Sequence, residues 1–306
     1  MSELGLPSLA RGAVLTLGTF DGVHLGHQEI LRDLVARSDR LGLPSVVVTF
    51  APHPLAVLNP AAAPKLLTSP TERLVAIAES APVHCAVVIP FSREVAALSP
   101  DQFVRLLLDR YRMKELVVGY DHGLGRGRQG DVTVLGALGK TLGFDVHVIE
   151  ARMDSHGIAI SSTAIRRAVA YGDLAAARAM LGRRYSFVGT VERGSNRGRS
   201  IGIPTLNLAV AGDKLLPPDG VYSVRVASGL GSYGGMMNLG GRPTFGESAR
   251  VPEIHLFDAG GDWYGQTVAV EFVSRLRDTV RFAGVKELVE QLSKDAAEAK
   301  VALTQA

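Results

Sequence analysis

The chain has 306 residues, of which 46% are hydrophobic and 21% charged, and its formal net charge is +3. This length exceeds one average domain, and this composition excludes a disordered or fibrous chain. The single cysteine, Cys85, excludes an intramolecular disulfide framework and fits the reducing cytoplasm. Because no run approaches about eighteen apolar residues and the N-terminus lacks a charged region with a cleavage pattern, we expect no membrane span and no export signal.

The first half of the chain alternates short apolar runs with amphipathic stretches. The apolar runs predict strands over 13–17, 46–50, 86–89, 116–119 and 146–149. The stretches between them predict helices over 28–41, 71–80, 101–111 and 132–142. Continuous apolar strands separated by helices indicate an α/β domain with a doubly wound parallel sheet.

The second half has a different pattern. After two predicted helices, 161–170 and 174–181, closely spaced glycines and prolines separate strands predicted over 186–192, 220–228, 234–239, 253–257 and 266–274. There is no room for crossover helices, so we expect an antiparallel barrel or sandwich, followed by a terminal helix over 285–299. We place the domain boundary between residues 183 and 184, which gives domains 1–183 and 184–306.

A candidate phosphate site joins the first strand to the first helix, where residues 18–27 read G-T-F-D-G-V-H-L-G-H. At such a junction, backbone N–H groups and the helix dipole favour phosphate. His24 and His27 lie three residues apart on one helix face and can donate to phosphate oxygens, and Gly26 lets a nucleotide approach the backbone. A later cluster, Ser162, Thr163 and Arg166, adds hydroxyls and a guanidinium at another helix start. A histidine metal pair and a simple Ser-Thr helix cap are the alternatives.

Two further segments, 49–54 (T-F-A-P-H-P) and 119–131, end the second and fourth predicted strands. With them, the first half resembles the adenylyltransferase domain of the bacterial bifunctional riboflavin kinase and FAD synthetase family. The resemblance implies that Asp121 helps to seat FMN. It also implies ATP binding by Gly18, Thr19, Phe20, Asp21, Gly22, His24, His27, Ser162, Thr163 and Arg166, with catalysis by His24, His27 and Arg166. The family usually reads G-x-D-F-x-F-G in the fourth-strand loop. Residues 121–125 read D-H-G-L-G here, so we expect weaker flavin binding without the two aromatic rings.

The second candidate site follows the strand at 186–192. A glycine-rich segment leads into Pro204-Thr205-Leu206-Asn207, and Thr205 and Asn207 point to one face of an extended strand, where their oxygens suit Mg²⁺. A flexible hairpin is the alternative reading. This segment resembles the riboflavin kinase domain, whose motif P-T-A-N carries alanine where Leu206 stands.

The resemblance to the kinase domain implies an antiparallel β-barrel and specific residue roles. Mg²⁺ would bind Thr205 and Asn207, Glu253 would be the catalytic base, and Arg242 and Arg277 would contact flavin. ATP would bind Gly194, Arg197, Gly198, Gly202 and Thr205. Thr279 stands at a position that is commonly acidic in the family.

Together the two resemblances imply that ATP phosphorylates riboflavin to FMN in the C-terminal domain and adenylylates FMN to FAD in the N-terminal domain. We expect riboflavin, FMN, ATP and FAD as ligands, Mg²⁺ as cofactor, and neither nucleic acid nor membrane as partner. Arginines gather near glycines in 123–130 and 194–202, which indicates local anion sites rather than a broad nucleic-acid face. Two alternatives stay open: a nucleotidyltransferase for another phosphorylated substrate, and a non-catalytic flavin-binding protein. The sequence indicates no oligomeric state.

Overall fold

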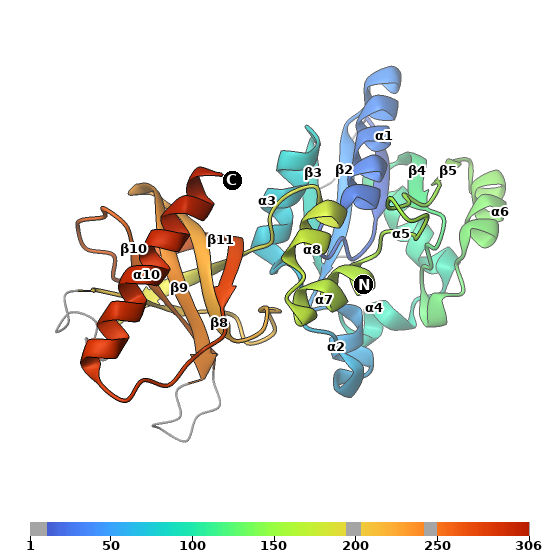
Figure 1. The fold of residues 1–306 in the computed structure, drawn as a ribbon. Helices are drawn as coiled ribbons and strands as arrows, with labels where there is room; N and C mark the ends of the chain where they lie inside the picture. Colours follow the sequence, from blue (N-terminus) through green and yellow to red (C-terminus); the bar gives the residue numbers. More distant parts are fainter. Residues whose placement is uncertain (1–10, 194–202, 242–249, 306) are drawn as a thin grey trace. The chain divides into compact units, whose positions relative to one another are not determined.

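The computed structural model describes residues 11–193, 203–241 and 250–305. The chain divides into two compact units, Met1–Ser162 and Thr163–Ala306. Figure 1 shows an α/β arrangement in the first unit and strands with a long terminal helix in the second.

The first unit is built on a five-stranded parallel sheet with the order β3-β2-β1-β4-β5. Its strands are β1 (Ala13–Leu17), β2 (Ser45–Ala51), β3 (Cys85–Pro90), β4 (Met113–Gly119) and β5 (Asp145–Ile149). The long helices between them are α1 (Leu25–Leu41), α3 (Pro70–Ser80), α5 (Pro100–Tyr111) and α6 (Val132–Leu142). The prediction of a doubly wound parallel sheet is confirmed. The short helices α2 (Pro54–Leu58), α4 (Arg93–Ala97), η1 (Pro60–Ala62) and η2 (Arg126–Arg128) escaped prediction because so few residues carry no readable periodicity.

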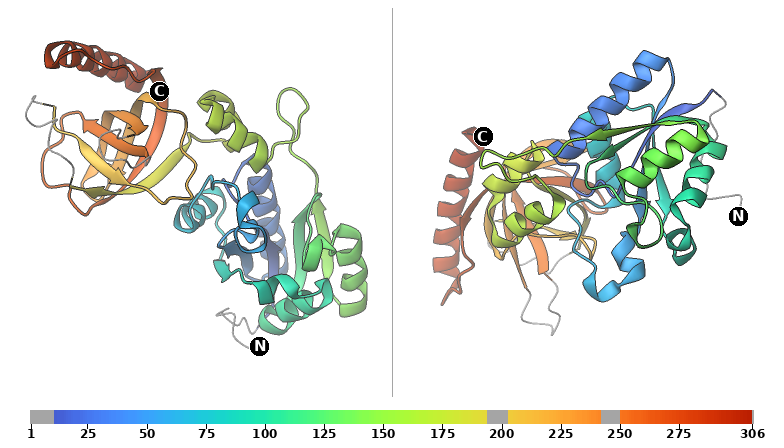
Figure 2. Two further views of the ribbon diagram at one scale, coloured as in Figure 1. Left: turned by 90° about the horizontal axis from the view of Figure 1, so that it is seen from below. Right: turned by 90° about the vertical axis from the view of Figure 1, so that its right-hand side faces the viewer.

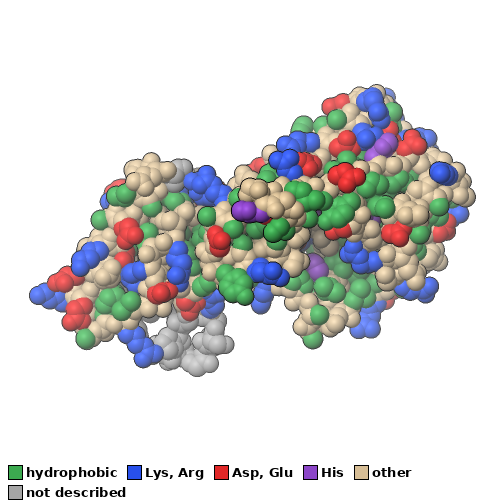
Figure 3. Space-filling model, turned by 45° about the vertical axis from the view of Figure 1, so that its right-hand side comes forward, with side chains coloured by type: hydrophobic (Ala, Val, Ile, Leu, Met, Phe, Trp, Pro, Cys, Tyr) green, Lys and Arg blue, Asp and Glu red, His purple; other side chains and the backbone are tan. Residues whose placement is uncertain are grey.

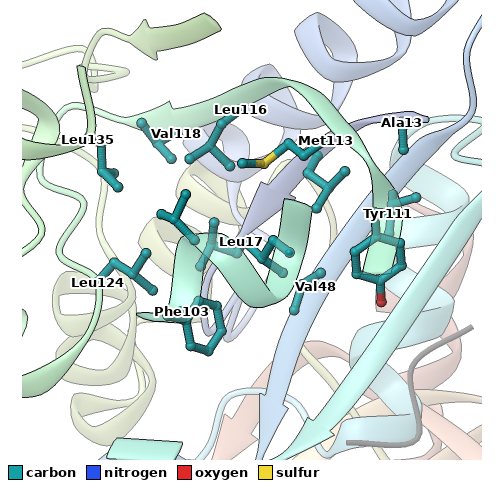
Figure 4. Close-up of a cluster of buried hydrophobic side chains, with 14 of the residues drawn as sticks. Ala13, Leu17, Val48, Phe103, Tyr111, Met113, Leu116, Val118, Leu124 and Leu135 are labelled. Carbon is teal, nitrogen blue, oxygen red and sulfur yellow. The ribbon is translucent and has the colours of Figure 1, made fainter. Parts of the chain in front are cut away.

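Alternate residues of each strand supply two separate cores, one on each face of the sheet. On one face, Leu15, Val48 and Leu116 pack with residues of α5 and α6 such as Phe103 and Leu135, and Figure 4 shows this cluster. On the other face the intervening strand residues pack against α1 and α3, in a cluster that includes Val14, Val47, Val117, Leu31, Leu34 and Ile77. Burial on both faces explains why the strands are continuously apolar.

The second unit contains a closed antiparallel barrel with the strand order β10-β7-β6-β11-β8-β9. Its strands are β6 (Ser186–Glu192), β7 (Leu206–Ala209), β8 (Gly220–Ser228), β9 (Gly231–Gly241), β10 (Arg250–Leu256) and β11 (Thr267–Arg277). Two helices, α7 (Ser162–Tyr171) and α8 (Leu174–Leu181), precede the barrel, and α10 (Val285–Thr304) lies along its outside (Figure 2). The expected antiparallel barrel with a terminal helix is confirmed.

On the face that Figure 3 shows, basic and acidic side chains are interspersed. Within the described residues, no helix combines the length and the apolar character that a membrane crossing requires.

Candidate functional site

The loop between β1 and α1 lies at the carboxyl end of the central strand, beside the point where the strand order reverses, which is where doubly wound sheets bind nucleotides. Gly18 N donates to Val48 O at 3.0 Å and thereby ties the loop to β2. Phe20 and Val23 have φ values of 47° and 41°, a left-handed conformation that costs free energy in residues other than glycine. Their side chains are buried, at 2% and 0% exposed, so core packing holds the strained loop.

Asp21 is the internal anchor of this loop. Its carboxylate is fully buried and accepts from the backbone N–H groups of Leu67 (3.0 Å) and Thr68 (2.9 Å) and from the Thr68 hydroxyl (3.0 Å). The same hydroxyl oxygen accepts from Gly22 N at 3.0 Å. Asp21 therefore fixes the loop to the segment before α3. Its predicted role as an ATP ligand stays a prediction.

His24 and His27 form a stacked pair at the start of α1, with ring centroids 3.7 Å apart and planes 19° from parallel. His24 is the N-cap, and its Nδ1 accepts from His27 N at 3.3 Å. A neutral His24 must then carry its proton on Nε2, which makes that atom a donor. Burial, reinforced by the charges of His24 and Arg73, lowers the pKa of His27 well below 6.5. An imidazole N–H at a helix N-terminus can donate to an anion.

Gly26 packs closely against the ring of His24. A Cβ at this position would lie 3.3 Å from two ring atoms of His24, Cε1 and Nδ1, and 3.7 Å from the Cβ of Arg152. A side chain here would require the His24 ring to shift by a few tenths of an ångström. The observed geometry therefore gives Gly26 a packing role in addition to the predicted close approach of the nucleotide.

Ser162, the first residue of α7, reaches the same loop, because its hydroxyl donates to Asp21 O at 2.8 Å. The structure therefore brings one member of the predicted Ser162, Thr163 and Arg166 cluster to the predicted phosphate loop. Thr163 and Arg166 belong to the second compact unit, and their action at this loop stays a prediction.

The loop after β4 is closed on itself. Leu124 and Gly130 exchange backbone hydrogen bonds of 3.0 and 2.9 Å, and Arg128 Nη2 donates to Asp121 O at 2.7 Å. Leu124, which stands where the family carries an aromatic residue, is 5% exposed and joins the core on the α5 and α6 side of the sheet. Burial and the charge of Arg128 lower the pKa of His122 to about 4, and its Nε2 is buried with no hydrogen-bonding partner among the described residues.

In the barrel, three polar residues form a row across adjacent strands. Asn207 of β7 pairs directly with Glu253 of β10 on one side and with Glu192 of β6 on the other. Directly paired residues of an antiparallel sheet lie on the same face, about 5 Å apart between Cβ atoms. Leu206 pairs with Ile254 on the opposite face, as the alternation of a strand requires. The predicted metal ligand and the predicted base are therefore neighbours, although they are 46 positions apart in the printed sequence.

The segment that leads into β7 is held by β10. His255 Nδ1 lies 2.9 Å from Pro204 O, and because a carbonyl oxygen only accepts, the imidazole donates. This bond fixes the backbone directly before Thr205, which is partly exposed. Glu192 is the residue of this row that sequence reasoning missed. Only the strand pairing identifies it.

Arg277, a predicted flavin contact, is engaged elsewhere in the unit. Its Nε and Nη2 donate to the two carboxylate oxygens of Asp295 at 2.8 and 2.6 Å, and Asp295 is 1% exposed. Hydrogen bonding to Asp295 raises the pKa of Arg277 despite the opposing effect of burial. The observed role of Arg277 is to fasten α10 to β11, and flavin binding stays a prediction. The predicted ligands Gly194, Arg197, Gly198, Gly202 and Arg242 lie outside the described residues.

One further group resembles a metal site by its composition. Ligand atoms of Glu115, Asp145 and His147 lie within 4.8 Å of one another near the amino ends of β4 and β5, at the edge of the sheet opposite to the phosphate loop. Glu115 accepts from Arg40 at 2.9 Å and from Arg37 at 3.4 Å. His147 Nε2 lies 3.1 Å from Glu115 without hydrogen-bond geometry. Two arginines already supply the positive charge, so this group is an ion-pair network rather than a fitting site for Mg²⁺.

Comparison with known proteins matches each half of the chain to a known protein family. The family model of FAD synthetase matches residues 6–164, and that of riboflavin kinase matches residues 181–303. The chain is 38% identical to a bifunctional riboflavin kinase/FMN adenylyltransferase of Escherichia coli K12, over 93% of this chain and 90% of the relative. It is 35% identical to a protein of the same description from Bacillus subtilis, over 94% and 91%.

A solved structure has the same fold over nearly the whole length. The crystal structure of a protein from Streptococcus pneumoniae, described as a macrolide-efflux protein, covers 96% of both chains with a TM-score of 0.85 and 32% identity.

Proposed function

The chain belongs to the family of bifunctional riboflavin kinase/FMN adenylyltransferases, and we propose how its residues divide the two reactions. ATP is the co-substrate of both. The riboflavin kinase domain forms FMN from riboflavin, and the FAD synthetase domain joins the AMP moiety of ATP to FMN and releases pyrophosphate. We set the boundary between the domains at residues 183 and 184, just after α8. We place the enzyme in the cytoplasm, where ATP is available and Cys85 stays reduced.

For adenylylation, we assign ATP binding to the loop Gly18–Gly22, the imidazoles of His24 and His27, and Ser162, Thr163 and Arg166. A phosphate oxygen of FMN attacks the α-phosphorus of ATP, and negative charge moves onto the leaving pyrophosphate. Imidazole N–H donors at the start of α1 would stabilise that charge. The stacked histidine pair at the N-terminus of α1 is the observation that carries this assignment.

For phosphorylation, we assign Glu253 as the base that accepts a proton from the ribityl hydroxyl group of riboflavin as its oxygen attacks the γ-phosphorus of ATP. Thr205 and Asn207 would hold Mg²⁺, because hydroxyl and amide oxygens are the hard ligands that this ion prefers. The ion would neutralise charge on the phosphates of ATP. The direct pairing of Asn207 with Glu253 supports both assignments, since it sets the base beside the predicted metal ligand.

The activity is tested by incubating the purified protein with riboflavin, ATP and Mg²⁺ and separating riboflavin, FMN and FAD by chromatography. We expect FMN first and FAD later. FMN without FAD would contradict the assignment of the first domain, and the absence of both products would contradict the whole proposal.

The base is tested with Glu253→Gln, which keeps the shape of the side chain but cannot accept the proton. We expect FMN formation to fall by about 10²- to 10⁴-fold, while added FMN and ATP still give FAD at the unaltered rate. Glu271→Gln, a change at another partly buried strand glutamate of the same barrel, is the control. Turnover of riboflavin by Glu253→Gln at the level of the control would refute the assigned base.

A further inference from the structure

Arg73 of α3 is the largest fully buried side chain among the described residues, with 1% of its surface exposed. It forms no ion pair within the described part of the chain, and its Nε is buried there without a hydrogen-bonding partner. Removing a cation from water without an anionic partner is costly. A buried arginine of this kind therefore calls for an explanation beyond packing.

The guanidinium is tied to the phosphate loop by a short chain of hydrogen bonds. Nη1 of Arg73 donates to Phe50 O at 2.7 Å and to Thr49 Oγ1 at 2.9 Å. The Thr49 hydroxyl in turn donates to Thr19 O at 3.0 Å. Thr49 is fully buried, so the connection from α3 through β2 to the loop after β1 is closed to water.

The charge of Arg73 also acts on His27 of the loop motif. Arg73 and His24 both lower the pKa of His27, in addition to the larger effect of burial. Asp21 is the acidic group that acts on Arg73 and opposes the lowering of its pKa by burial. The carboxylate of Asp21, however, is already hydrogen-bonded to Leu67 and Thr68.

We propose that Arg73 is a positioning residue of the adenylyltransferase site, which fixes the phosphate loop through Thr49 and places a permanent positive charge behind that loop. The proposal rests on the assignment of ATP to this loop and identifies a determinant of its binding outside the motif. A charge in a low-dielectric interior acts on phosphates more strongly than one in water. Because guanidinium stays protonated at all working pH values, it also disfavours a second proton on His27.

Four variants separate the two parts of the proposal. Arg73→Met removes the charge and the hydrogen bonds, whereas Arg73→Lys keeps the charge. Thr49→Val removes only the bridge to Thr19, and Thr49→Ser restores a hydroxyl. Arg37→Met is the matched control, since Arg37 is a partly buried arginine of the same unit that pairs with Asp33 and Glu115. Near-ultraviolet circular dichroism and thermal unfolding establish that each variant is folded, and riboflavin kinase turnover provides an internal activity control.

The readouts are kcat and KM for ATP in FAD formation, and the titration of the His27 imidazole by NMR, assigned with His27→Gln. We expect Arg73→Met and Thr49→Val to lose roughly 10- to 100-fold in kcat/KM for ATP, with Thr49→Ser near the wild type. Only Arg73→Met should move the His27 titration upward, toward its ordinary value near 6.5. Arg73→Lys and Thr49→Val should leave that titration in place.

An unchanged His27 titration in Arg73→Met would overturn the electrostatic part of the proposal. If Thr49→Val and Arg37→Met had equal kcat/KM values for ATP in FAD formation, the proposal that Arg73 positions the phosphate loop through Thr49 would be overturned. A wild-type protein that makes no FAD would refute the proposed function instead, and the His27 titration would still decide where the charge of Arg73 acts.

Discussion

At the scale of single residues, buried polar side chains hold the first site in place. Asp21 belongs to the loop motif, yet its carboxylate faces inward and accepts bonds from Leu67 and Thr68. These hydrogen-bond donors stabilise the buried carboxylate, and without the carboxylate the donors would lack an acceptor. The motif therefore contains structural residues beside those that can reach a ligand.

Replacing Asp21 by Asn tests this structural role. An amide offers one acceptor oxygen and two N–H groups where the structure presents only donors. We expect the variant to lose about 1–3 kcal/mol of stability in the first unit and to form FAD more slowly, with riboflavin kinase turnover unchanged. Thermal unfolding and both product assays measure these effects. If the Asp21→Asn variant were as stable as the wild type, the buried carboxylate would not be the anchor of the loop.

His122 gives the first unit a dependence on pH. Burial and Arg128 lower its pKa to about 4 in the folded state, whereas an unfolded histidine titrates near 6.5. Below about pH 6.5, His122 binds a proton in the unfolded chain, whereas in the folded chain it stays neutral until about pH 4. The free energy of unfolding therefore falls by up to about 3 kcal/mol as the pH decreases through this range.

We expect His122→Gln to reduce the loss of stability between pH 7 and pH 5, as measured by denaturant unfolding. His156→Gln, at an exposed position, should retain the loss seen in the wild type. An NMR titration midpoint of His122 near 6.5 would contradict the lowered pKa.

At the scale of elements, the terminal helix α10 shows how a predicted amphipathic helix is fixed to a barrel. The carboxylate of Asp295 accepts hydrogen bonds from Nε and Nη2 of Arg277 and, at 2.8 Å, from the side-chain amide of Gln291. Farther along, Ser223 Oγ donates to Ala299 O at 3.1 Å, and Arg225 Nη2 donates to Leu303 O at 3.0 Å. Helical periodicity predicts the apolar face, but the polar links come from strands distant in sequence.

Asp295→Ala should detach this helix in part, because it leaves the Arg277 guanidinium without its partner in a partly buried site. We expect the barrel to lose about 1–3 kcal/mol and riboflavin kinase turnover to fall at elevated temperature. FAD formation from added FMN should be unaffected. Glu290→Ala, on the exposed side of the same helix, is the control. Equal unfolding temperatures of the two variants would contradict the role of the ion pair.

At the scale of the whole molecule, each unit has its own buried core, and the matched family models fall on different halves of the chain. Separate cores allow separate folding. The position of the cut matters, however, because α7 begins at Ser162 and carries Thr163 and Arg166 beyond the end of the first compact unit.

We therefore predict that fragment 1–183 forms FAD from FMN. Fragment 1–162 should fold, but its rate of FAD formation should be at least about 10²-fold lower because it lacks the Arg166 guanidinium. Fragment 184–306 should form FMN from riboflavin. Circular dichroism and the two product assays check these expectations. Full activity of fragment 1–162 would exclude Arg166 from the site.

The sequence by itself determined the features that repeat locally or stand together in a motif. The alternation of apolar runs with amphipathic helices established the parallel sheet, the short punctuated strands predicted an antiparallel second half, and the contiguous motifs pointed to the two phosphate-handling sites. Only the tertiary structure decided which motif residues face inward and which residues outside the motifs support them. Asp21 meets Thr68 across 47 positions, Arg73 meets Thr49 across 24, and Arg277 meets Asp295 across 18. Hydrogen bonds between segments so far apart leave no periodic trace in the sequence, because folding alone brings their donors and acceptors together.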